Sequence, residues 1–261
     1  MVISSKSNAQ IKELILLQKR KKLREERGLF VVEGRRMTLE APSEALHSLY
    51  MTQGFFNKHQ REIEAFNRPF TLVSDEVFAY VSVTKTPQGI LGLIKKNQYT
   101  LEDFFKTEYP FLLVLESVQD PGNLGTLFRS GEAAGVSGII MNENCADIYG
   151  PKVVRSTMGS LYRLPFIQSE NLEQDLNIIK KKGIFIYAGD LEGSKVYYEE
   201  NYPKSMALLI GNEGQGLSEW IKKKADALVK IPMAGQAESL NAAVAAGILM
   251  FEVKKQHDKM P

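Results

Sequence analysis

The 261-residue sequence has few residues of the kinds that build disulfides and metal sites. Cys145 is the only cysteine, which excludes an internal disulfide and a cysteine-rich zinc site. The three histidines, His47, His59 and His257, lie far apart, and no HExxH-like pair occurs. These absences argue against a metal-dependent hydrolase and predict a protein without a metal cofactor.

Long apolar runs are also missing. No run of 18 uncharged apolar residues occurs, so no transmembrane helix is predicted. Near the N-terminus the basic run follows the apolar stretch, and Lys12 and Glu13 interrupt that stretch. A secretory signal has the opposite order, so we expect a cytoplasmic protein. Hydrophobic residues make up 44% of the chain, which is enough to fill a core and excludes intrinsic disorder.

Positive charge gathers at one end of the chain. The net charge is +2, but residues 1–36 hold ten Lys and Arg against four Asp and Glu. Residues 37–261 hold 23 basic residues against 27 acidic ones. A basic N-terminal segment suggests a phosphate-bearing partner. A solvated helix face would give the same composition, so charge alone leaves both interpretations open.

The pattern of apolar residues predicts two α/β domains, as the length also allows. We place an N-terminal domain with a leading basic helix, ended by Gly28, at residues 1–100. A polar and aromatic segment, 97–109, has the character of a linker. The second domain, 107–261, opens with five consecutive apolar residues, 111–115, typical of a strand covered on both faces of a parallel sheet. Its last predicted helix, 239–253, is apolar on nearly every face and must be buried within the domain or against a second copy.

Three loops in the second domain follow predicted strands, and open α/β sheets bind ligands at such strand ends. The first contains the Asp-Pro-Gly-Asn turn at 120–123, which leads into a helix. Arg129 then lies about a turn and a half along that helix. An ion pair with a surface carboxylate is the alternative role for Arg129.

The other two loops carry glycines and polar residues. The segment 210–218 has three glycines that let the backbone turn sharply near a ligand, but it matches no nucleotide-binding fingerprint. In the loop 231–241, Ser239 is a suitable N-cap for the last helix. Asn241 begins an otherwise apolar helix, and because a buried amide needs partners, we expect its side chain to face a site.

Together and in this order, these loops are specific. The runs DPGNLGTLFRSGEAAG, IGNEGQGLS and IPMAGQAESLNAAVAAGILMFE resemble the three signature motifs of the SpoU/TrmH-type RNA ribose 2′-O-methyltransferases of the SPOUT superfamily. GPKVVRSTMGSLYRLPF looks like the family's stretch between the first two motifs, and FVVEGRRMTLEA resembles a small ribosomal-protein-like RNA-binding domain. The resemblance implies a parallel-sheet domain with a deep trefoil knot, S-adenosylmethionine as cofactor, RNA as substrate, and a homodimer with each site near the subunit boundary.

The resemblance also implies roles for particular residues. The cofactor would bind at Gly211, Ile231, Met233 and Leu240. The catalytic set would be Arg129, Asn123, Glu213, Ser239 and Asn241, with Arg129 central. An arginine is an unsuitable base because its pKa lies above 12. We therefore expect Arg129 to hold the phosphate and stabilise the developing alkoxide, with that phosphate or water as proton acceptor.

Two further arginines, Arg155 and Arg163, lie between the first two motifs and would either contact phosphate or form surface ion pairs. The leading hypothesis is methylation of a ribose in structured RNA, most readily ribosomal RNA. Transfer RNA is the alternative substrate. A non-catalytic RNA-binding or ribosome-assembly protein on the same fold is the alternative class.

Overall fold

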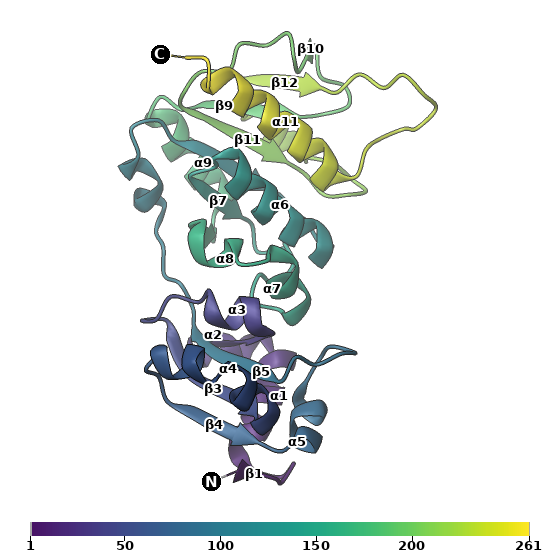
Figure 1. The fold of residues 1–261 in the computed structure, drawn as a ribbon. Helices are drawn as coiled ribbons and strands as arrows, with labels where there is room; N and C mark the ends of the chain where they lie inside the picture. The colour runs from purple at the N-terminus through teal and green to yellow at the C-terminus, as the bar shows by residue number, and fades with distance from the viewer. Residues whose placement is uncertain (1, 261) are drawn as a thin grey trace. The chain divides into compact units, whose positions relative to one another are not determined.

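The computed structural model describes residues 2–260, which form two compact units (Figure 1). The first unit consists of the residues up to Asn97 together with Asp147–Tyr162. The second consists of Gln98–Ala146 together with the residues from Arg163 onward. Both units are α/β, and the second contains an all-parallel sheet, so the predicted fold class is confirmed.

The first unit is built on a five-stranded sheet of order β1-β4-β3-β5-β2. Strands β1, β4 and β3 are parallel, whereas β5 runs antiparallel to both β3 and β2. Helices α1 and α5 share one hydrophobic core with the strands, and α3 packs on β5. The elements are β1 (Val2–Ile3), α1 (Ala9–Lys19), α2 (Lys21–Arg27), β2 (Leu29–Glu33), α3 (Arg35–Leu39), β3 (Leu46–Thr52), α4 (Gln53–Ala65), β4 (Phe70–Val73), α5 (Asp75–Val81) and β5 (Ile90–Lys95).

The leading basic helix is two helices rather than the single one predicted. At Arg20 the backbone becomes extended, with φ −119° and ψ 108°, and α2 begins at the next residue. The break has a tertiary cause. The Arg24 side chain is only 4% exposed, donates to the backbone oxygen of Leu17, and forms an ion pair with Asp147. Gly28 ends α2 with φ 63°, as predicted.

The segment Asp147–Tyr162, which includes α7 (Pro151–Thr157) and most of α8 (Ser160–Arg163), packs within the first unit. The Tyr162 hydroxyl donates to the Met37 backbone oxygen at 2.7 Å, and the Tyr149 ring lies 4.7 Å from that of Phe30. The sequence places this segment in the second domain. The contacts of the folded chain assign it to the first unit instead. The domain boundaries at residues 100 and 107 stay a prediction.

The predicted linker, 97–109, contains the short helix η1 (Leu101–Lys106). Thr100 and Asp103 form a capping box at its start, and Phe104 is fully buried in the core of the second unit. Gly138 provides the space, because a Cβ there would lie 2.6 Å from the Phe104 ring. Most of this polar segment is thus part of the second unit and not a free linker.

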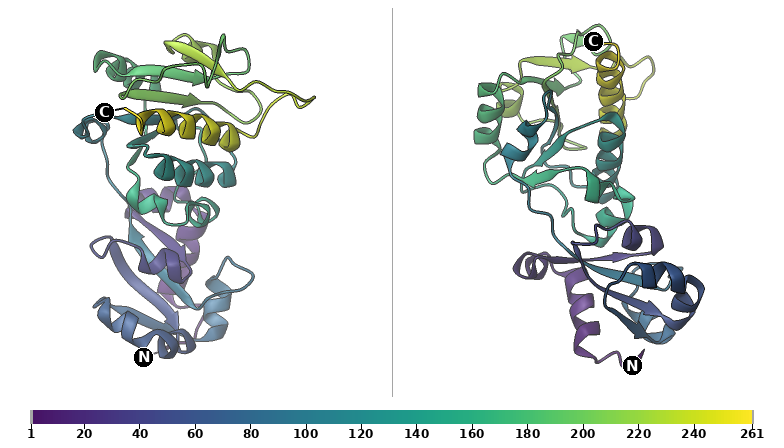
Figure 2. Two further views of the ribbon diagram at one scale, coloured as in Figure 1. Left: turned by 45° about the horizontal axis from the view of Figure 1, so that its top comes forward. Right: turned by 60° about the vertical axis from the view of Figure 1, so that its left-hand side comes forward.

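The second unit is a seven-stranded parallel sheet of order β10-β12-β9-β11-β6-β7-β8. One face packs against η1, α9 and α10 through a cluster that includes Leu112, Leu209 and Leu176. Helices α6 and α11 lie side by side on the other face (Figures 1 and 2). The elements are β6 (Phe111–Leu115), α6 (Pro121–Ala134), β7 (Gly138–Met141), β8 (Phe166–Gln168), α9 (Leu172–Lys181), β9 (Phe185–Gly189), β10 (Lys195–Val196), β11 (Met206–Ile210), α10 (Glu219–Lys222), β12 (Ala227–Lys230) and α11 (Ala242–His257).

The last helix begins three residues later than predicted. Its N-cap is Asn241, whose Oδ1 accepts from the backbone N–H groups of Ala243 and Val244, so the assignment of this cap to Ser239 is wrong. The helix buries one side against α6, but Val244 and Phe251 remain 52% and 48% exposed. The trefoil knot stays a prediction. Across residues 2–260, no helix is long and apolar enough to cross a membrane.

Candidate active site

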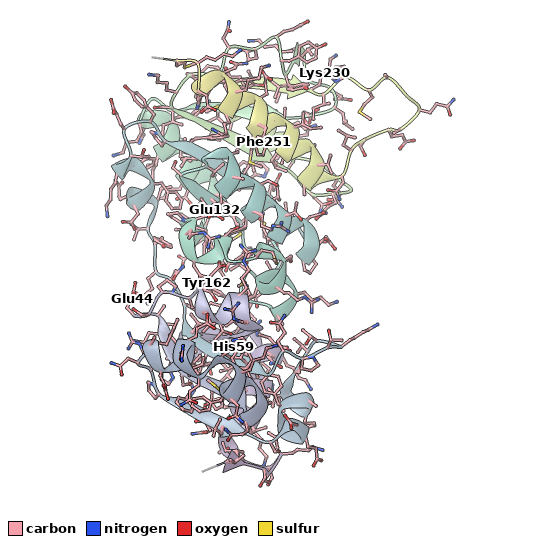
Figure 3. All side chains as sticks on the ribbon, viewed as in Figure 1. Glu44, His59, Glu132, Tyr162, Lys230 and Phe251 are labelled. Atoms are coloured by element: carbon pink, nitrogen blue, oxygen red, sulfur yellow. The ribbon has the colours of Figure 1, made fainter. Side chains whose placement is uncertain are left out.

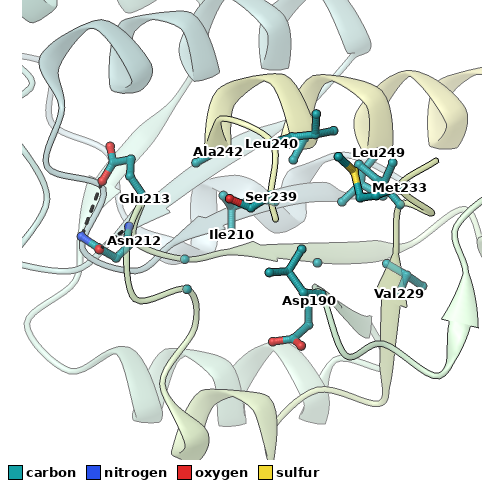
Figure 4. Close-up of a pocket in the computed structure, with 17 residues that line it drawn as sticks. Asp190, Ile210, Asn212, Glu213, Val229, Met233, Ser239, Leu240, Ala242 and Leu249 are labelled. Carbon is teal, nitrogen blue, oxygen red and sulfur yellow. Dashed lines mark hydrogen bonds between the residues drawn. The ribbon is translucent and has the colours of Figure 1, made fainter. Parts of the chain in front are cut away.

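Of the three loops singled out in the sequence, those that follow β11 and β12 line one pocket, together with the end of β9 (Figure 4). The loop that follows β6 contributes no residue to the lining and is joined to the site by hydrogen bonds to Glu213. Helix α11 forms another wall through Ala242, Ala245 and Leu249. Six of the predicted site residues line the pocket: Gly211, Glu213, Ile231, Met233, Ser239 and Leu240. All four predicted cofactor residues are therefore at one cavity, although their role stays a prediction.

The loop after β11 is shaped by a close backbone approach. The backbone N–H groups of Asn212 and Gly216 each donate to the other's carbonyl oxygen at 3.0 Å. A Cβ on Gly211 would lie 2.2 Å from the Gly216 carbonyl carbon, so no side chain fits there. Gly216 has φ 69°, which favours glycine. These two glycines are needed by the loop itself, which leaves its backbone at the pocket wall.

Asn212 fixes this loop to the first one. Its Oδ1 accepts from the backbone N–H groups of Gly214 and Gln215 at 2.9 and 3.0 Å. Its Nδ2 donates to the Ser117 carbonyl oxygen at 2.8 Å. The loop that follows β11 is thus held internally and also against the loop that follows β6.

Glu213 joins the second loop to the start of α6. Its carboxylate accepts from the backbone N–H groups of Gln119 at 3.2 Å and Asp120 at 3.0 Å, and from Asn123 Nδ2 at 3.1 Å. Partial burial raises the pKa of Glu213, but the hydrogen bonds from Asn123 and the backbone outweigh it and hold the pKa below its usual value. Glu213 is therefore an ionised acceptor at neutral pH.

Asn123 continues this row of side chains to the third loop. Its Oδ1 accepts from Asn241 Nδ2 at 2.9 Å, while its backbone N–H donates to the N-cap Asp120 at 2.7 Å. The predicted set Glu213, Asn123 and Asn241 is thus connected by direct hydrogen bonds. Asn241 is an exposed helix cap that faces the site loops, and not a buried amide.

Glu116 is a site residue that the sequence analysis missed. It lies at the end of β6, is 8% exposed, and accepts from the backbone N–H of Ser218 at 2.8 Å and from its hydroxyl at 2.6 Å. Glu213 reaches from the second loop to the first, and Glu116 reaches from the first loop to the end of the second. The two carboxylates therefore fasten the loops reciprocally. A buried acid directly after an apolar strand was the available signal.

Asp190 at the end of β9 also lines the pocket and was missed. Its carboxylate accepts from the Glu192 backbone N–H at 2.8 Å and pairs with Lys222 Nζ at 2.8 Å. The bond to Asp190 raises the pKa of Lys222. The rule that identified the other loops, polar residues after a strand, applies equally to Asp190, which directly follows β9.

Three predicted residues, Asn123, Asn241 and Arg129, do not line the pocket, and of these only Arg129 is also outside the row of hydrogen bonds to Glu213. It lies on the exposed side of α6, and within residues 2–260 it makes no ion pair or side-chain hydrogen bond. The alternative of a surface ion pair is therefore not realised for Arg129. Arg163 does pair with Glu132, whereas Arg155 is exposed and has no acidic partner within the same range.

Comparisons with known proteins cover nearly the whole chain. Residues 110–251 match the SpoU rRNA Methylase family, and residues 8–92 match the MRM3-like substrate binding domain. The chain is 31% identical over 255 residues to the "23S rRNA (guanosine(2553)-2'-O)-methyltransferase RlmP" of Bacillus subtilis (strain 168), covering 97% of this chain and 98% of that protein.

Two further proteins to which the chain is similar are also rRNA methyltransferases. The chain is 34% identical over 217 residues to the "23S rRNA (guanosine-2'-O-)-methyltransferase RlmB" of Neisseria meningitidis, covering 80% of this chain and 86% of the other. A crystal structure of an AdoMet-bound rRNA methyltransferase from Sinorhizobium meliloti superposes with a TM-score of 0.86 at 30% identity, covering 98% of both chains.

Proposed function

Because the chain belongs to the SpoU rRNA methylase family, we propose that it transfers a methyl group from S-adenosylmethionine to a ribose 2′-hydroxyl of ribosomal RNA. The observation that carries the proposal is the similarity to a 23S rRNA methyltransferase over 97% of the chain, including both units. Such a substrate would also make the cytoplasm the site of action. Transfer RNA remains the alternative substrate.

The pocket suits this cofactor chemically. None of its lining residues is Lys or Arg, and its two acidic residues, Asp190 and Glu213, are held by Lys222 and by backbone and amide donors. The lining therefore contains no cation that would repel the sulfonium charge of the cofactor. Ile210, Val229 and Leu249 supply apolar walls for a flat base. We assign the backbone at Gly211 and the side chains of Ile231, Met233 and Leu240 to cofactor binding.

The bound cofactor would supply an already activated methyl group, so the chain's own residues need only position and stabilise the attacking oxygen. We propose that Arg129 does this, because its guanidinium is exposed and unpaired within the described chain and can bind an RNA phosphate and the developing alkoxide. Asn123, Glu213 and Asn241 would orient the start of α6. Ser239 lines the pocket and would contact the ligands directly. No metal is assigned a role.

We further propose that the enzyme is a homodimer. Val244, Ile248 and Phe251 are spaced i, i+4 and i+7 on α11, which places them on one face, and Val244 and Phe251 are about half exposed. Phe251 is labelled on α11 in Figure 3. A second copy of this chain would cover such a face isologously and bring a second subunit close to the α6 and α11 side of the site.

The direct test is methyl transfer by the full chain from labelled S-adenosylmethionine to ribosomal RNA isolated from cells that lack the enzyme. Incorporation at a ribose 2′-oxygen is expected. Incorporation into transfer RNA alone would show that the alternative substrate is the correct one. Cofactor binding without incorporation into any cellular RNA would favour the non-catalytic RNA-binding protein.

A further inference from the structure

The basic segment at the start of the chain offers less free charge than its composition suggests. Seven of its ten cations lie within 4.0 Å of a carboxylate: Lys6, Lys21, Lys22, Arg24, Arg27, Arg35 and Arg36. Arg24 is buried in its ion pair and cannot reach a ligand. The positive charge of the leading helices α1 and α2 is therefore only partly available to an RNA.

A cleft in the same unit has a better set of groups. It lies between α3, the first half of α4, α5 and the loop before β5, and its lining includes Arg35, Arg36, Lys58 and His59. Asp75 is the only acidic residue in that lining. Lys58 is exposed and forms no ion pair within residues 2–260, so its charge is fully available. The cleft thus presents three permanent cations around an open cavity.

Arg35 and Arg36 are held in place by hydrogen bonds that occupy only some of their N–H donors. Nε and Nη2 of Arg35 donate to Glu62 at 3.1 and 2.8 Å, and its backbone N–H donates to Gln88 Oε1 at 2.7 Å. Arg36 donates to Glu40 through Nε at 2.8 Å. Because a guanidinium has five N–H donors, each arginine retains donors for an anion.

An aromatic surface lies beside these cations. Helix α4 leaves helical geometry at His59, with φ −122° and ψ 21°. The His59 ring lies 4.5 Å from the buried ring of Phe55 and is tilted by 31° to it. The His59 side chain, labelled in Figure 3, is 21% exposed and lines the cleft. Unpaired RNA bases stack on such rings, whereas paired bases in an RNA helix are inaccessible to them.

On the opposite wall of the cleft, the backbone at Gly89 lies very close to the start of α4. Gly89 has φ 85°, and a Cβ there would lie 2.8 Å from Oγ1 of Thr52, the N-cap of α4. The loop that carries Gln88 can therefore lie directly against the start of α4. Because both walls are fixed by these contacts, the cleft is formed before any ligand binds.

We propose that this cleft binds an unpaired nucleotide of the RNA substrate, with its phosphate on Arg36 and Lys58 and its base on His59. The proposal rests on the proposed function, because it takes RNA as the substrate. It differs in placing recognition at a defined site of the first unit, away from the basic leading helices and away from the pocket at β11. The predicted outcome is therefore a loss of RNA affinity without a loss of cofactor affinity.

The test measures binding of the full chain to an unmodified 23S rRNA transcript over a range of salt concentrations. Lys58→Ala should weaken binding and reduce the slope of log affinity against log salt by about 0.7, the value for one phosphate contact on a single strand. His59→Ala should weaken binding at least about fivefold with an unchanged slope, and His59→Phe should restore it, because stacking does not depend on salt.

Lys12→Ala is the matched control, because Lys12 is also exposed and without an acidic partner in the described chain, but lies on α1. It should bind RNA as the parent does. Lys58→Ala and His59→Ala variants that bind RNA like the parent would overturn the proposal that this cleft binds RNA. This outcome is distinct from failure of the proposed function, in which the parent itself methylates no RNA.

Discussion

Asn241 donates from its side-chain nitrogen to the side-chain oxygen of Asn123 at 2.9 Å, and this hydrogen bond joins the start of α11 to the start of α6. Its own oxygen is occupied in capping α11, so the orientation of the amide is fixed by both ends. Asn123 in turn donates to Glu213. The three motif loops therefore meet in one row of hydrogen bonds that borders the pocket.

Arg129→Ala should separate binding from turnover. The proposed cofactor contacts lie at Gly211, Ile231, Met233 and Leu240, so affinity for S-adenosylmethionine should stay at the parental value. Methyl transfer should fall by about 10²–10³-fold, on the order expected for loss of one oriented transition-state donor. Arg129→Lys should also fail, because one ammonium cannot reproduce the planar fork.

Calorimetry gives the cofactor affinity of these variants, and single-turnover methylation gives the rate. A near-parental rate for Arg129→Ala would show that the exposed guanidinium has no part in the reaction.

Glu213 should give the fold a defined acid sensitivity. Its pKa in the folded protein lies below the usual value of 4.5, so the stabilisation from its hydrogen bonds is complete above that value and is lost as the pH falls through the lowered pKa. Glu213→Gln cannot titrate. The difference in urea midpoint between parent and Glu213→Gln should therefore be largest near pH 7 and shrink below about pH 4.5. A difference that is constant down to pH 3 would contradict this account.

Glu116→Ala should loosen the loop that follows β11. The variant leaves the partly buried N–H and hydroxyl of Ser218 without their acceptor, which costs about 1–3 kcal/mol of stability. Affinity for S-adenosylmethionine should fall with it, because Gly211 and Glu213 belong to the same loop. Glu116→Gln keeps one acceptor oxygen and should recover part of both. Unchanged calorimetric affinity in a destabilised Glu116→Ala would confine Glu116 to folding.

Phe251→Glu should convert a dimer into a monomer. A charge on the exposed face of α11 cannot be desolvated against a second copy without a large penalty. Gln174→Glu adds the same charge to α9 on the other face of the sheet and is the control. Sedimentation of the full chains at micromolar concentration measures the change. A parent that sediments as a monomer would remove the proposed dimer altogether.

Much of the second unit was accessible from the sequence, because its strands are continuous apolar runs with polar residues directly after them. That rule found Asn123, Gly211 and Glu213. It also covers Glu116 and Asp190, which directly follow β6 and β9. The fold of this unit and most of its pocket were therefore predictable from local pattern.

Other features depend on partners distant in the sequence. Ser239 and Asn241 are both good N-caps, and the bond to Asn123 distinguishes them only in the folded chain. The break between α1 and α2 follows from the pairing of Arg24 with Asp147, 123 residues away. Phe104 in the polar segment becomes a core residue because Gly138 leaves it room. No local periodicity signals these contacts.

The inclusion of Asp147–Tyr162 in the first unit affects how the chain can be dissected. A fragment from residue 107 onward would keep this segment but lose its packing partners, including Phe30 and Met37. Buried side chains such as Val153, Val154 and Leu161 would then face water and favour aggregation. A graft of the first unit onto another protein must likewise carry two separate pieces of chain. The two units are therefore not interchangeable modules, and deletion of one is a perturbation of the other.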